Sequence, residues 1–214
     1  MLDPFFGPER AMQTRTLRER VAAIEAAAKT SIPIVVTQTA QRRTIDEPAV
    51  EGLGPTTRIL LPDSLLAVAS DGEIAFLLAQ SIAEAPDAFR RTIVATFLLT
   101  IAAALAVLMS DRIGFRRDDD PLVRLSLVAA FLGIFCLGLY PVYNAYSRTV
   151  TARADIAARE LTHDPASGIR AFLRIVDDGA QQACVPRTAR LYFAARPSYG
   201  SRIAALQNKP NPCR

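Results

Sequence analysis

Two long runs without a charged residue constrain the fold of this chain more than any other feature. They cover residues 93–109 and 125–143, which are 17 and 19 residues long. A helix needs about 20 apolar residues to cross the ~30 Å hydrocarbon core of a bilayer. Between the runs, residues 111–120 read DRIGFRRDDD, a short and highly charged segment. The pattern predicts a transmembrane helical hairpin. The alternative is a soluble hairpin buried in a helical core, although runs this evenly apolar exceed what one buried stripe needs.

Composition agrees with one domain that carries a membrane element. The chain has 214 residues, half of them are hydrophobic, and its mean hydropathy is positive. The net charge is +4, and no run of basic residues is interleaved with aromatic residues. We therefore expect membrane lipid, and no nucleic acid, as a partner. The first residues, 1–4, lack the basic-then-apolar pattern of a secretory signal.

The arginines around the two runs hardly decide the orientation in the membrane. Positive charge favours the cytoplasmic side. Five arginines flank the outer ends: Arg90, Arg91, Arg148, Arg153 and Arg159. Four lie between the runs: Arg112, Arg116, Arg117 and Arg124. The count leans slightly towards a folded domain in the cytoplasm.

The three cysteines, Cys136, Cys184 and Cys213, do not have the spacing of metal ligands. Cys184 and Cys213 could pair in an oxidising compartment. We expect two unrelated free thiols instead.

Periodicity predicts short elements on either side of the hairpin. Apolar residues at helical spacing indicate helices over residues 12–30, 147–161 and 201–207, and another that opens at the Asp164-Pro165 cap. β-branched residues indicate strands within residues 31–39 and 58–61, and the polar residues 41–55 are interpreted as a loop.

One segment before the first run combines an apolar face with polar residues. Ser70 and Glu73 have the spacing of a capping box, and Pro86 is predicted to end the helix. Glu73, Gln80 and Glu84 should project from a polar face beside the buried one. Taken alone, this pattern is typical of an amphipathic core helix.

The ordered set of segments resembles the integral-membrane zinc metallopeptidases that include the CAAX prenyl proteases and the HtpX-type proteases. The resemblance covers about residues 17–206. It implies a mainly α fold with a small β element, in which a transmembrane hairpin (residues 92–145) is inserted between two parts of a peptidase-like domain (residues 1–91 and 146–214). It also implies a multi-pass protein of the bacterial inner membrane. The matching segments are residues 17–25, 32–36, 52–66, 73–84, 147–158, 164–165 and 196–206.

The departures from this family lie where its chemistry is performed. The family's His-Glu-x-x-His motif holds Zn²⁺ with two histidines and uses the glutamate as base on the zinc-bound water. The three corresponding residues here are Gln80, Ser81 and Glu84. Members of the membrane type often carry further spans before the first helix. The sequence leaves open whether these are absent or are supplied by a different start codon.

The rest of the family's site is also changed. Thr151 replaces the third ligand, a glutamate, and Arg196 replaces a histidine of the tail. Asp155 is retained; in the family this aspartate orients a zinc-bound histidine. The single histidine, His163, lies beside a helix cap, and we expect an exposed loop residue there. With one histidine and no cysteine cluster, a histidine-rich zinc site cannot form within one chain.

We therefore expect no cofactor and no catalytic residues. Six positions, which we call the relic positions, should converge in the fold: Gln80, Ser81, Glu84, Thr151, Asp155 and Arg196.

Three functions remain open from the sequence. The first is a membrane-anchored, non-catalytic module that binds a membrane protein, a peptide or an active paralogue. The second is an active membrane metalloendopeptidase in which Glu84, Asp155 and Glu73 hold Mg²⁺, Ca²⁺ or Mn²⁺; against it, Arg148 or Arg153 could neutralise Asp155. The third is an unrelated membrane-hairpin accessory protein, for which no packing of Arg196 against the helix of Gln80 is expected.

Overall fold

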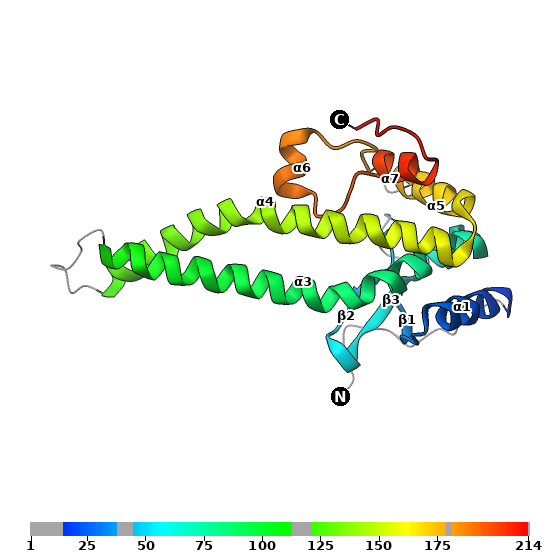
Figure 1. Ribbon diagram of the computed structural model, residues 1–214, viewed down its shortest axis with the longest axis horizontal. Coiled ribbons are helices and arrows are strands. Elements are labelled where there is room, and N and C mark those ends of the chain that lie inside the picture. The colour runs from blue at the N-terminus through cyan, green and yellow to red at the C-terminus, as the bar shows by residue number, and fades with distance from the viewer. Residues whose placement is uncertain (1–14, 38–44, 113–120, 179–180, 214) are drawn as a thin grey trace.

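The computed structural model describes residues 15–37, 45–112, 121–178 and 181–213. It is mainly helical with one small sheet, as predicted (Figure 1). In chain order the elements are α1 (Arg15–Ala28), β1 (Ile34–Thr37), β2 (Ala49–Glu51), a 3₁₀ turn (Gly54–Thr56), β3 (Arg58–Pro62), α2 (Asp63–Val68), α3 (Asp71–Arg112), α4 (Pro121–Thr162), α5 (Pro165–Asp178), α6 (Arg187–Phe193) and α7 (Tyr199–Leu206).

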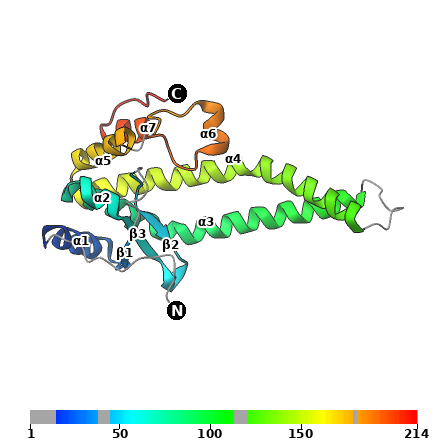
Figure 2. The same ribbon diagram turned by 180° about the vertical axis from the view of Figure 1, so that it is seen from behind.

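The helices α3 and α4 lie side by side and project from the compact part of the molecule as a long arm (Figures 1 and 2). Each has 42 residues, and both are long and apolar enough to cross a membrane. Only 11% and 0% of their most apolar windows are buried inside the protein. Large side chains such as Phe97 and Leu137 are exposed on the arm. Helices buried in the core of a soluble protein would not expose so much apolar surface. The arm therefore indicates a membrane protein.

The prediction that Pro86 ends its helix is wrong, because α3 continues through it to Arg112. A proline inside a helix removes one backbone hydrogen bond. Here the apolar run that follows favours helix, which satisfies the backbone of a segment surrounded by lipid. The segment that resembles the peptidase motif and the first apolar run therefore form one continuous helix.

The sheet has the strand order β1-β3-β2. β3 lies in the centre; it pairs in parallel with β1, where Ile34 lies opposite Ile59, and antiparallel with β2, where Val50 lies opposite Ile59. β2 lies inside residues 41–55, so the loop prediction is wrong there. Three residues are too few to show a period, and pairing with β3 makes this segment a strand. The short helices α2 and α6 were not predicted for the same reason.

The core packs α1, α5 and the sheet around the first part of α3. Leu17, Val21 and Ile24 bury one face of α1. Phe76 of α3 and Phe172 of α5 are completely buried and meet edge to face, with their ring centroids 5.9 Å apart. Aromatic pairs in this geometry add to the stabilisation that burial alone gives.

Gly168 of α5 packs directly against the ring of Phe76 on α3, and we expect Gly168→Ala to lower the free energy of unfolding by about 2 kcal/mol. A Cβ atom there would lie 2.5–2.7 Å from three ring carbons of Phe76. Alanine is the better helix former by up to about 1 kcal/mol, but Phe76 is fully buried and cannot move aside. Gly138→Ala in α4 is the control, because a Cβ there meets no atom within 4 Å. Chemical unfolding followed by circular dichroism compares the two; equal stabilities would contradict the close approach.

The cysteine prediction is also wrong, since Cys184 and Cys213 form a disulfide. Their sequence separation of 29 gives no indication of proximity, but the fold brings the residues after α7 back to the segment before α6. Cys136 carries a free thiol.

Candidate functional site

Four of the relic positions are connected where α3, α4 and the segment between α6 and α7 come together: Glu84, Thr151, Asp155 and Arg196. Gln80, Ser81, Glu84, Thr151 and Asp155 are all buried. The Thr151 hydroxyl of α4 donates to Oε1 of Glu84 at 3.4 Å, which joins the two helices. The Ser81 hydroxyl instead donates to the Leu77 carbonyl of its own helix at 3.1 Å.

Arginine side chains engage the carboxylate of Glu84 from two directions. Nη2 of Arg91, two turns further along α3, lies 2.6 Å from Oε1, and Nη2 of Arg196 lies 3.8 Å from Oε2. The Glu84 side chain is 2% exposed. A buried carboxylate needs such partners, because transferring an unpaired charge from water is costly. The contact of Arg196 with the helix that carries Gln80 is the packing that an unrelated hairpin protein would lack.

Asp155 has a partner that the sequence interpretation did not assign to it. Nε and Nη2 of Arg202, on α7, each donate to one Asp155 oxygen at 2.9 Å, which is the bidentate geometry of a strong charge-assisted pair. The expectation that Arg148 or Arg153 neutralises Asp155 is wrong for Arg148, which donates to backbone carbonyls near α6. The Arg202 guanidinium also lies 3.9 Å from the ring centroid of Phe172, a cation–π contact.

Glu47 completes the site, and sequence reasoning missed it. Its side chain is 4% exposed and lies in the segment before β2. Oε1 accepts from Arg202 at 2.5 Å, and Oε2 pairs with Arg196. Burial alone would raise the pKa of Glu47, but the charges of Arg202 and Arg196 and a hydrogen bond with Tyr199 hold it below its usual value.

The pKa values of two groups that contact Glu47 are raised, whereas that of Glu47 itself is lowered. Burial and the negative charge of Glu47 raise the pKa of the Tyr199 hydroxyl well above its usual value. Burial would lower the pKa of Arg202, but Glu47 and Asp155 raise it above the usual arginine value. The lowered pKa of Glu47 and the raised pKa of Arg202 are consistent with an ionised pair between these two side chains.

Three carboxylates and three guanidinium groups therefore form one set of ion pairs, which we call the arginine network. Its members come from α3, α4, the segment before β2, and the C-terminal segment with α7. They are Glu47, Glu84, Asp155, Arg91, Arg196 and Arg202. The opposite charges are equal in number, so the three buried carboxylates need no further ion to balance them.

Two other candidate residues lie elsewhere. Glu73 forms the predicted capping box with Ser70, at 2.9 and 3.4 Å, and pairs with Arg170 and Arg174 of α5 at 3.6 and 3.2 Å. The prediction that Glu73 joins Glu84 and Asp155 in one cation site is therefore wrong. His163 is exposed at the end of α4, as predicted.

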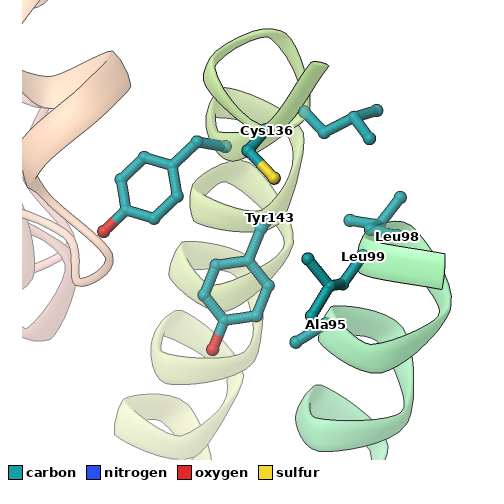
Figure 3. Close-up of a pocket in the computed structure, with 7 residues that line it drawn as sticks. Ala95, Leu98, Leu99, Cys136 and Tyr143 are labelled. Carbon is teal, nitrogen blue, oxygen red and sulfur yellow. The ribbon is translucent and has the colours of Figure 1, made fainter. Parts of the chain in front are cut away.

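The surface has one hollow beside the arginine network and another within the arm formed by α3 and α4. One, of about 560 Å³, lies beside the arginine network between residues 45–49 and 193–199, and has polar and apolar walls. The other, of about 370 Å³, lies between α3 and α4 in the apolar arm (Figure 3). Its walls carry Ala95, Leu98, Leu99, Cys136, Leu139, Tyr140 and Tyr143.

The model of peptidase family M48 matches residues 11–209 of this chain. The chain belongs to peptidase family M48. The ordered segments and the contact of Arg196 with α3 agree with this membership, so the interpretation as an unrelated hairpin protein is wrong.

Two similar proteins extend the comparison. The uncharacterized metalloprotease YhfN of Bacillus subtilis (strain 168) is 21% identical over 223 residues, which cover 99% of this chain and 52% of YhfN. The crystal structure of S. mikatae Ste24p superposes with a TM-score of 0.70 at 19% identity, covering 92% of this chain and 51% of that one. The fold is thus similar to that of the matched half of Ste24p, and the chain spans about half the length of both proteins.

Proposed function

We propose that this M48 member is a membrane-anchored, non-catalytic module that binds or regulates a partner protein. The observation that carries the proposal is the arginine network at the relic positions. Positive charge beside Glu84 comes from Arg91 and Arg196. In the family the corresponding charge is that of the metal ion, which activates water and polarises the scissile carbonyl.

The residues present do not fit zinc. Zinc sites use deprotonated thiolate, imidazole or carboxylate donors. At the former motif the donors are the Gln80 amide, the Ser81 hydroxyl and the Glu84 carboxylate, and Glu84 already faces two arginines. A zinc ion would have to displace guanidinium groups and then lie beside their charge. In the part of the chain that the structure describes, no group of three or more His, Cys, Asp or Glu side chains is placed to hold a metal.

The hollow beside the network supplies a surface for a partner. It is about 560 Å³, and its mixed walls include Glu47, Arg196 and Tyr199 next to the apolar Ile45 and Val185. Such a surface suits a polypeptide, which offers both backbone hydrogen bonds and apolar side chains. The partner we propose is a segment of a membrane protein or an active relative of this chain.

Zinc content tests the proposal directly. We expect the detergent-purified chain to contain less than about 0.1 zinc per chain by mass spectrometry, while an M48 relative with an intact His-Glu-x-x-His motif approaches one under the same purification. Peptide hydrolysis by the two proteins is measured in parallel. Near-stoichiometric zinc that supports hydrolysis would contradict the proposal, because the ligands would then come from a second chain or from carboxylates assigned here to ion pairs.

We also infer that the folded domain faces an oxidising compartment. A disulfide between Cys184 and Cys213 is typical of such compartments, because cytosolic thiols are kept reduced. Five arginines at the outer ends against four within residues 112–124 differ too little to oppose this inference. This orientation places segment 112–124 in the cytoplasm, and it reverses the slight lean that counting arginines gave.

A further inference from the structure

The short helix α6 is fixed to α4 at the point where the second apolar run ends. Nδ2 of Asn144, the residue directly after that run, donates to the carbonyls of Leu191 and Tyr192 at 3.0 and 3.1 Å. One turn further along α4, Nη1 of Arg148 donates to the carbonyls of Arg190 and Ala194 at 2.9 and 2.8 Å. The last carbonyls of a helix lack partners within the helix. Two side chains of α4 therefore hold the C-terminal end of α6 at a defined level along the arm.

That level is the boundary between the apolar and the polar parts of α4. On one side lie the exposed residues Leu137 and Tyr140, and on the other lies Arg148. Of the elements that follow α4, α6 lies furthest along the arm in both views (Figures 1 and 2). The disulfide Cys184–Cys213 and the hydrogen bond from Arg190 to the Cys213 carbonyl, at 2.9 Å, fasten the segment around α6.

The end of α6 held at this boundary exposes large apolar side chains. Leu191 and Tyr192 are exposed, and Phe193 is 86% exposed, although apolar residues of this size are usually buried. Arg187, at the start of the same helix, is also exposed. Aromatic side chains gather at the interface between a bilayer and water, and basic residues face the headgroups there.

We propose that α6 is an interfacial anchor that lies in the headgroup region of the same bilayer that α3 and α4 cross, with Phe193 inserted towards the acyl chains. Large apolar side chains are exposed on both α6 and the end of the apolar run of α4, and Asn144 joins the two helices at this level, so one lipid surface would cover both. A protein partner would need to reach the same boundary and displace lipid from α4. The anchor holds the C-terminal lobe, which comprises α6, α7 and the segment between them, at a fixed height above the membrane, and with it Arg196 and Arg202.

A single-tryptophan experiment tests this placement, because the chain contains no tryptophan. The full chain carrying Phe193→Trp is reconstituted in phosphatidylcholine vesicles with brominated acyl chains, which quench only fluorophores that reach the lipid. Two matched variants serve as references for strong and for weak quenching. Phe97→Trp places the probe on the arm, and Leu173→Trp places it on an exposed site of α5 in the folded domain.

We expect Phe193→Trp to show at least about half the quenching of Phe97→Trp, and Leu173→Trp to show almost none. Phe193 is so exposed that its replacement alters no core packing, and circular dichroism checks that all three variants are folded. Quenching of Phe193→Trp no stronger than that of Leu173→Trp would overturn the proposal. So would a blue-shifted emission without lipid quenching, because protein rather than lipid would then cover α6.

Discussion

Replacing Arg202 by methionine is expected to lower the free energy of unfolding by about 3–5 kcal/mol. The Arg202 side chain is 1% exposed and supplies the positive charge for both Asp155 and Glu47. Methionine keeps much of the length and the contact with Phe172, so the substitution mainly removes charge and five donors. Two carboxylates then remain buried with less compensation. Chemical unfolding of the detergent-solubilised protein, followed by circular dichroism, measures the loss.

Two comparisons separate the charge effect from loss of packing. Arg90→Met breaks the pair of Arg90 with Asp87, which is solvent-exposed on the arginine side, and should cost less than about 1 kcal/mol. Adding Glu47→Gln and Asp155→Asn to Arg202→Met removes the uncompensated charges and should restore part of the stability, since neutral replacements of buried ion pairs are often tolerated. If Arg202→Met costs no more than Arg90→Met, the arginine network does not hold α7 to α4.

The larger elements could be predicted because their patterns are long. Residues 12–30 repeat at helical spacing and contain α1 (Arg15–Ala28), and the Asp164-Pro165 cap opens α5, where Asp164 accepts from the Ser167 amide at 3.0 Å. β3 follows its β-branched and leucine-rich run. Pro86 shows the limit of a local rule, because the preference of a long apolar run for helix outweighs the loss of one hydrogen bond.

The candidate site was predicted only in part, for a different physical reason. The resemblance to a family gave the positions on α3 and α4, because the ligand spacing of a motif is a local property of a helix. Glu47 pairs with residues 149 and 155 positions further along the chain, and no periodicity encodes that contact. The sequence did contain one usable signal. A carboxylate at position 84, on the buried face of the helix, requires a positively charged partner, and arginine and lysine are the residues that supply one. A search for the basic partner of Glu84 would have considered Arg91, two turns further along the same helix, and Arg196, at the position of the family's tail histidine.

Removing the disulfide is expected to cost about 3–4 kcal/mol, the second large effect, because the bond closes a loop with a sequence separation of 29 and restricts the unfolded chain. The double variant Cys184→Ser and Cys213→Ser removes it. A reductant should destabilise the unmodified chain by a similar amount and leave the double variant unchanged. Cys136→Ser is the control, since that thiol is free. Equal stability of the double variant and the unmodified chain would mean that packing alone fixes the segment around α6.

The same cysteines decide on which side of the membrane the domain lies. Thiols in intact cells are blocked with a permeant maleimide before lysis, and the chain is then reduced and labelled with a second, heavier maleimide. If the domain faces an oxidising compartment, Cys184 and Cys213 escape the first reagent and acquire the second, while Cys136 does not. If all three react with the first reagent, the pair is reduced in the cell and the domain lies in the cytoplasm. The bond would then contribute nothing to stability there, and the arginine network and core packing would have to hold the C-terminal lobe without it.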